Sequence, residues 1–246
     1  MGYLTRGAGL SNTSGLTLSV WFYVFPQGAP STLRTFFRCG ADIGAVDGQP
    51  FSGTTIGCFV AGSGDFVFLD VRNCPECPAQ LAASAFTTGG GSMTRGGWNH
   101  IVASFQRLGL NSIKGQMCLN GVIRNPTTTS VADITAIPLN DGFIGVPVDS
   151  VFAQNITESP LLPLAQYQMW MHQNIAMTDQ NMANFFTITN GVGMPRDYLV
   201  AEVAFGTPEL SFIGNPTQFP QNRGSLGNTF SQVGTTNNFS PLPSFG

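Results

Sequence analysis

The clearest pattern in the sequence is an alternation of apolar and polar residues over residues 16–24 and 99–105. On one side of the first stretch lie Leu16, Leu18, Val20, Phe22 and Val24, and on the other lie Thr17, Ser19, Trp21 and Tyr23. In the second stretch, Ile101, Ala103 and Phe105 alternate with His100, Val102 and Ser104. A period of two predicts β-strands, each with one strongly buried face.

A hairpin is predicted soon after the second strand. Residues 114–119 form a further strand with Met117 and Leu119 on its apolar face, and Asn120-Gly121 follows. An Asn-Gly pair between apolar residues favours a type I′ turn, which needs a positive φ at both central residues. We therefore expect a positive φ at Asn120 and at Gly121.

The remaining pattern predicts short strands and one short helix. A first strand around Tyr3 and Leu4 is expected to pair with that of residues 16–24, and further strands are expected from the apolar runs at residues 35–39, 55–61, 65–71, 141–145, 164–170 and 198–205. Thr178 is a plausible helix N-cap, and Met182, Phe185 and Phe186 then share one apolar face. The expected fold is all-β, with two antiparallel sheets packed as a sandwich.

Several of these stretches resemble laminin-G-like domains, which are concanavalin-A-like jelly rolls. The resemblance lies in Trp98-Asn99-His100-Ile101-Val102 followed by Met117–Val122, and in four further stretches in family order within residues 10–187. It implies core or turn roles for Trp21, Trp98, His100, Asn120, Gly121 and Trp170. In the last strand, Ala165-Gln166 and Gln168 replace the family's acidic pair and arginine, which weakens the case for a calcium site.

The resemblance predicts a jelly-roll domain over residues 1–190, with a strand and an extended Phe/Gly/Pro-rich arm over 191–246. Residues 210–241 resemble the C-terminal segment of laminin-G-like structural proteins of tailed bacteriophages. The candidate assembly residues of this arm are Phe212, Phe219, Arg223, Phe230, Phe239 and Phe245. The five phenylalanines among them make the arm too apolar for a solvated tail, so we expect it to pack on its own sandwich or on a neighbouring subunit. The phage-like pattern favours a neighbour, with the sandwich core complete before the arm begins.

Charged residues make up only 9% of the chain, against about 25% in ordinary soluble domains. Either neutral polar residues cover the surface, or other subunits cover much of it. The net charge is −3 and Lys114 is the single lysine, so nucleic-acid binding is not expected. The apolar run at residues 20–25 is too short to span a membrane. With no recognisable secretory signal, we expect synthesis in a host cytoplasm.

The five cysteines leave at least one thiol free or paired between chains. For Cys74 and Cys77 the alternatives are a short-loop disulfide, a zinc site and reduced thiols, although a structural zinc needs four ligands and a second Cys-x-x-Cys pair is missing. Five aspartates lie in or near predicted loops without a spacing that ties them together, at residues 42, 47, 65, 70 and 149. We expect no cofactor, with calcium as the alternative.

Catalysis is not expected either. Glycoside hydrolases need two suitably spaced carboxylates, and Glu76, Glu158, Glu202 and Glu209 do not lie in the strand pattern of related enzymes. The hypothesis is a structural subunit of a bacteriophage virion, on the capsid surface or the tail, that forms homo-oligomers and contacts other virion proteins. The alternative is a lectin-like adsorption protein that recognises host surface glycans. Its candidate sugar-stacking residues are Trp21, Tyr23, Trp98 and Trp170, for which core packing is the competing role.

Overall fold

A computed structural model of the protein describes most of the predicted strands. The described residues are 2–5, 11–24, 32–40, 51–60, 66–74, 83–88, 93–110, 112–124, 126–130, 136–137, 139, 142–144, 164–189, 192–213, 222–227 and 231–234. In some of these strands, and in the β13–β14 hairpin introduced below, the description covers the side chains only in part.

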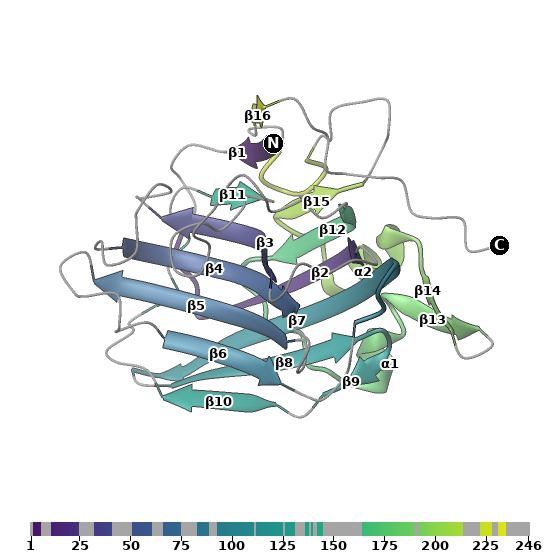
Figure 1. The fold of residues 1–246 in the computed structure, drawn as a ribbon, viewed down its shortest axis with the longest axis horizontal. Coiled ribbons are helices and arrows are strands. Elements are labelled where there is room, and N and C mark those ends of the chain that lie inside the picture. Colours follow the sequence, from purple (N-terminus) through teal and green to yellow (C-terminus); the bar gives the residue numbers. More distant parts are fainter. Residues whose placement is uncertain are drawn as a thin grey trace.

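The described strands form two antiparallel sheets that face each other, which confirms the predicted jelly-roll sandwich (Figure 1). The first sheet has the order β16 (Ser231–Gly234), β1 (Gly2–Thr5), β11 (Gly142–Ile144), β3 (Thr32–Gly40), β4 (Phe51–Val60), β5 (Phe66–Cys74) and β6 (Ala83–Thr88). The second has the order β10 (Thr127–Ser130), β8 (Ser112–Leu119), β7 (Gly97–Gly109), β2 (Gly15–Val24), β12 (Leu164–Trp170) and β15 (Leu210–Phe212), with β9 (Val122–Ile123) also paired to β8.

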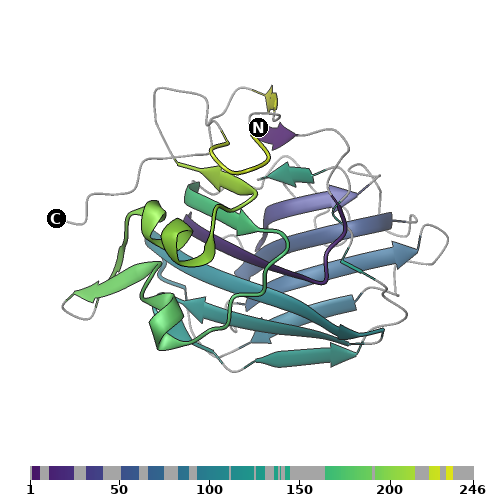
Figure 2. The ribbon, with the colours of Figure 1, turned by 180° about the vertical axis from the view of Figure 1, so that it is seen from behind.

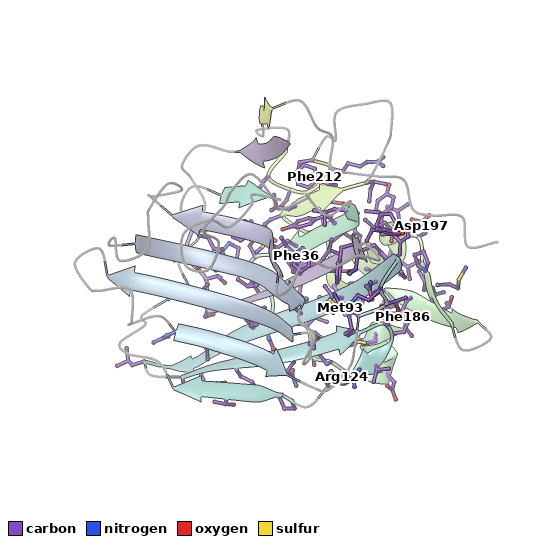
Figure 3. All side chains as sticks on the ribbon, in the orientation of Figure 1. Phe36, Met93, Arg124, Phe186, Asp197 and Phe212 are labelled. Carbon is purple, nitrogen blue, oxygen red and sulfur yellow. The ribbon has the colours of Figure 1, made fainter. Side chains whose placement is uncertain are left out.

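The main core lies between the two sheets. The predicted apolar faces of β2 and β7 point into it, since Leu16, Phe22 and Phe105 are fully buried. Phe22 on the second sheet meets Phe36 on the first with 5.1 Å between ring centroids. Phe36 is labelled in Figure 3. Burial of large aromatic rings from both sheets is the main favourable term that holds such a sandwich together.

A third layer covers the face of the second sheet that points away from the first (Figure 2). We call residues 173–206 the covering layer. It contains α1 (Asp179–Met182), a hairpin of β13 (Phe186–Thr189) and β14 (Val192–Pro195), and α2 (Tyr198–Phe205). The predicted N-cap of α1 is confirmed, because the Thr178 hydroxyl accepts a hydrogen bond from Asn181 N at 3.2 Å.

The strand predicted over residues 198–205 is wrong, because this segment is helix α2. The Asp197 carboxylate caps the helix by accepting from Leu199 N at 3.0 Å. Gly206, with φ +86°, ends it and donates its N–H to Glu202 O at 2.9 Å. The segment is apolar nearly throughout, so neither a period of two nor one of 3.6 could identify it.

The expectation that the sandwich core is complete before the arm also needs correction. β15 is the edge strand beside β12 in the second sheet, and its Leu210 and Phe212 are fully buried in the main core. The Phe212 ring lies edge-on to Tyr167 at 6.1 Å. Further on, β16 pairs with β1 in the first sheet. Deleting residues 207–246 would therefore remove strands of both sheets.

Truncation of Phe212 tests this placement. We expect Phe212→Ala to lower the free energy of unfolding by about 3–5 kcal/mol, because it leaves a cavity in the core. The control is Leu108→Ala, because Leu108 is 52% exposed and should change stability by less than about 0.5 kcal/mol. Urea denaturation of both variants gives the comparison, and equal stability would contradict the placement of Phe212 in the core.

Candidate functional site

The outer face of the second sheet carries polar groups that the covering layer satisfies. Thr17 on β2 and Ser104 on β7 are cross-strand partners whose hydroxyl oxygens are 3.0 Å apart. From the covering layer, Asn174 Nδ2 donates to Ser104 Oγ at 2.7 Å and Ile175 N donates to Thr17 Oγ1 at 2.9 Å. The Thr17 hydroxyl in turn donates to Gln173 O at 2.8 Å. These bonds let two polar side chains lie fully buried without an unpaired hydroxyl.

His100 lies at the centre of this face and is buried. Its ring stacks on Trp21 with 4.7 Å between centroids, and Phe186 of β13 meets it edge-on at 5.8 Å. Its Nε2 is 3.0 Å from Ser19 Oγ, while its Nδ1 is buried without a hydrogen-bond partner. Burial lowers the His100 pKa to about 3, so the ring is neutral at physiological pH.

The Ser19–His100 pair has the contact of a catalytic dyad but not its surroundings. A serine hydrolase needs a solvent-accessible serine and a group that orients the second ring nitrogen of the histidine. Ser19 is 3% exposed and His100 2%, and no hydrogen-bonding group orients His100 Nδ1. The geometry supports the structural role expected for His100.

Two asparagines fasten the hairpin to β7. Asn120 has φ +48° and Gly121 has φ +82°, which confirms the predicted turn. The Asn120 side chain accepts from His100 N at 2.8 Å and donates to Asn99 Oδ1 at 2.9 Å. Asn99 Oδ1 also accepts from Thr94 N at 2.7 Å, and Asn99 Nδ2 donates to Thr94 O at 3.0 Å. The residues of the Trp98-Asn99-His100 and Asn120-Gly121 motifs thus form hydrogen bonds that join the hairpin turn to the start of β7.

The closing strand β12 joins the sheet to α2 through uncharged side chains. Gln168 Nε2 donates to Tyr198 O and to Glu202 Oε1, each at 3.2 Å. Ser211 of β15 donates to the same Glu202 oxygen at 3.1 Å. Trp170 Nε1 donates to Gly206 O at 2.9 Å. Glu202, the single charged residue within α2, therefore points inward.

Next to Glu202 on its outer side, α2 exposes an apolar stripe. Leu199 is 49% exposed and Val203 is 88% exposed, while Ala201 is the buried residue of the helix. Leu199 and Val203 are four residues apart and so lie on one stripe of the helix. Ala204 is also exposed. We call Leu199, Val203 and Ala204 the α2 face.

Part of the C-terminal arm packs on its own chain. Asn222 is 6% exposed and uses its amide fully: Oδ1 accepts from Ser211 N and Gly224 N, and Nδ2 donates to the carbonyl oxygens of Glu209 and Gly227. A Cβ atom at Gly224 would collide with the carbonyl oxygens of Pro208 and Glu209, so glycine is needed there. This segment of the arm is therefore fixed to β15.

The proposed assembly residues of the arm thus have different environments. Phe212 belongs to the core. Arg223 is exposed, and its guanidinium carbon lies 5.3 Å from the centre of the Tyr198 ring at the start of α2. Phe219, Phe230, Phe239 and Phe245 lie outside the described residues. Their assembly role stays a prediction.

The aromatic candidates for sugar stacking are mostly covered. Trp21 and Trp170 are 3% and 2% exposed, so neither offers a ring face to a ligand. Tyr23 and Trp98 are half-buried cross-strand partners on β2 and β7, with an edge-on ring contact of 5.8 Å. Of the four aromatic residues predicted to stack on sugars, Tyr23 and Trp98 are the two that are partly exposed.

The predicted metal and thiol sites are described only in part. Within the described residues, no group of three or more His, Cys, Asp or Glu side chains is arranged to hold a metal ion. The aspartates considered for calcium have side chains outside this description, and so do Cys74 and Cys77. Cys118 is a buried free thiol whose pKa is raised to about 12, mainly by desolvation. A thiol with this pKa is a poor nucleophile at neutral pH.

Some residues that complete the site had no such role predicted for them. Asn99 carries bonds that fasten the hairpin, Gln168 carries bonds to α2, and Leu199 and Val203 form the exposed stripe of the covering layer. Asp197 directly before an apolar run was an available helix-start signal for α2. No comparable local signal marks Glu202 as inward-facing, because its partners Gln168 and Ser211 lie on the strands β12 and β15, outside the helix.

Comparisons with known proteins give similarity at the level of fold. No protein-family model and no curated protein matches the chain. Among solved structures, a heptameric SAP-like pentraxin from Limulus polyphemus aligns with TM-score 0.48 and 16% identity over 80% of this chain and 83% of its own. The enzymatically active domain of bacteriophage CBA120 tailspike protein 2 aligns with TM-score 0.38 and 14% identity over 69% of this chain and 23% of its own. The binding domain of botulinum neurotoxin serotype C1 aligns with TM-score 0.42 and 12% identity over 88% and 48%.

None of the helices within the described residues has the length and apolar character needed to cross a membrane.

The hairpin gives a first prediction for this site. Gly121→Val should destabilise the protein by more than the 1–2 kcal/mol or so expected from a left-handed backbone alone. The added strain comes from Phe186, whose Cε2 lies 2.9 Å from the position of a Cβ at Gly121. Gly109→Val is the control, because a Cβ at Gly109 meets no atom within 4 Å. Equal melting temperatures for the two variants would contradict the packing of Phe186 on the turn.

His100 gives a prediction for pH dependence. Its pKa in the folded protein, about 3, lies below the ordinary value of 6.5. As the pH falls below 6.5, the unfolded chain gains a proton at this residue and the folded chain does not. Stability should therefore decrease by about 1.4 kcal/mol per pH unit between pH 6.5 and pH 3, and this loss should be absent above pH 6.5.

The measurement compares wild type with His100→Phe, which keeps a ring but removes the titration. Urea denaturation at pH 7 and pH 5 should show roughly 2 kcal/mol more loss for wild type than for the variant, because contributions from all other groups are common to both. Identical losses would mean that His100 is protonated in the folded protein at pH 5.

Proposed function

We propose that this protein is a structural subunit of a bacteriophage particle and acts through protein–protein contacts. The observation that carries the proposal is the α2 face, which exposes Leu199 and Val203 while the helix turns its Glu202 inward. An exposed apolar stripe without charge is typical of a surface that another protein covers. We propose homo-oligomers and other virion proteins as the partners.

The composition supports a role in assembly. With 9% charged residues, the chain has little of the surface charge that keeps a free monomer soluble. Such a chain gains most when neighbouring subunits cover its neutral surface. The proposed location is accordingly the virion, after synthesis in the host cytoplasm, without nucleic-acid binding, membrane insertion or a cofactor.

The bacteriophage origin rests on the resemblance of the C-terminal segment to structural proteins of tailed phages. Asn222 and Gly224 belong to the resembling pattern, and each has a specific structural role against β15. A pattern whose residues are needed by the fold is a better basis for the resemblance than composition alone. The proposed positions of the subunit are the capsid surface and the tail.

Glycan binding is the second candidate function, and the Tyr23–Trp98 pair favours it. Both rings are half-buried, and rings with an open face can stack on a sugar. The other two candidate rings, Trp21 and Trp170, are buried under the covering layer. The alternative therefore depends on one aromatic pair, whereas the assembly proposal depends on a whole helix face.

Mass spectrometry of purified particles tests the proposed function. Particles released by lysis of cells that carry this gene should contain the chain in many copies at a fixed ratio to the major capsid protein. Its absence from intact particles would overturn the proposal. A glycan array then addresses the second candidate: binding by wild type that is lost in Trp98→Ala and kept in Leu108→Ala would favour the adsorption role.

A further inference from the structure

We infer that the α2 face pairs with the α2 face of a second copy of this chain, with the two helices antiparallel about a two-fold axis. The inference rests on the proposed assembly function and names the partner of that surface. The most exposed large apolar side chain among the described residues is Val203, at 88%. Leu199 precedes it by about one turn on the same side of the helix.

The shape of α2 suits self-pairing. A two-fold interface uses the same patch on both copies, so the patch must be complementary to itself. With the axis near the middle of the helix, Val203 of one copy packs beside Leu199 of the other. Ala204 and Gly206 are small and exposed, which permits the two backbones to approach closely.

The charges around α2 favour the antiparallel orientation. At the start of the helix, Arg196 and the exposed Arg223 outnumber the N-cap carboxylate of Asp197 by one charge, whereas the last turn of α2 holds no basic residue. The C-terminal carbonyl groups of a helix carry partial negative charge. An antiparallel pair brings Arg223 of each copy toward the C-terminal end of the other helix. A parallel pair would place the two Arg223 side chains together.

The size of the surface predicts a weak contact between isolated copies. A stable interface buries about 800 Å² on each partner, more than the exposed stripe of one two-turn helix provides. In a particle with many copies, effective concentrations reach roughly the millimolar range. A contact that is weak in dilute solution is then sufficient.

Analytical ultracentrifugation of the 246-residue chain up to about 1 mM tests the pairing. Wild type should show a concentration-dependent monomer–dimer equilibrium. Val203→Glu and Leu199→Lys should each weaken dimerisation by roughly tenfold or more, because the new charge then lies against an apolar side chain of the other copy. Leu108→Lys and Val122→Glu are matched controls at positions 52% and 50% exposed elsewhere, and both should dimerise as wild type does.

An equimolar mixture of the two α2 variants tests the orientation. In the antiparallel pair the new carboxylate of one chain faces the new ammonium of the other, so mixed dimers should form at least as well as wild-type dimers. A wild-type chain that stays monomeric overturns the inference, and so do controls that weaken dimerisation as much as the α2 variants. A mixture that stays monomeric overturns the antiparallel arrangement. Circular dichroism checks that each variant is folded. If Val203→Glu does not fold, Leu199→Lys alone still tests the contribution of the α2 face to dimerisation.

The outcome is separable from the proposed function. A chain that dimerises through α2 but is absent from particles leaves this inference intact and removes the phage proposal. A chain found in particles whose Val203→Glu variant is incorporated at full occupancy leaves the phage proposal intact, and the α2 face then has no role in assembly.

Discussion

The outer face of the second sheet is largely shielded from solvent at β2, β7 and β12. The polar side chains on this face must therefore form hydrogen bonds inside the protein. In an ordinary sandwich the alternate residues of such strands would face water. Here Thr17, Ser104 and Gln168 are buried and hydrogen-bonded to the covering layer. Since an unpaired buried hydroxyl or amide costs about 1–3 kcal/mol, these bonds fix where the covering layer lies.

The two-layer sandwich was predictable because its strands obey local rules. Alternation identified the buried faces of β2 and β7, and Asn120-Gly121 identified the turn. The covering layer was predictable only at α1, where Thr178 gives a local cap. Helix α2 was not predictable from periodicity, because its outward residues are as apolar as its inward ones. The side of α2 that faces the sheet is set by hydrogen bonds to Glu202 from Gln168 on β12 and from Ser211 on β15. Neither partner belongs to the helix.

The arm illustrates a second limit of sequence patterns. Phenylalanine, glycine and proline indicate a segment that packs on something, but they do not identify the surface. Phe212 belongs to the sheet because residues 209–212 return alongside β12, where Glu209 Oε2 accepts from Met171 N at 2.8 Å and Leu210 pairs with Met169. Asn222 then holds the next described segment against β15. Such non-local pairings leave no trace in the local sequence.

The shortage of charge in this chain has two separate physical origins. On the inner side of α2, the carboxylate of Glu202 already lies 3.2 Å from Gln168 Nε2, and a carboxylate in place of Gln168 would add a like charge without a counter-ion. On the outer side no such requirement exists. Val203 is 88% exposed, and solvent would accept lysine or glutamate there without disturbing the packing. The fold therefore explains the absence of an acidic residue at position 168, where Gln168 stands, whereas the apolar residues on the outside of α2 need an explanation from outside the monomer, such as a surface on another protein.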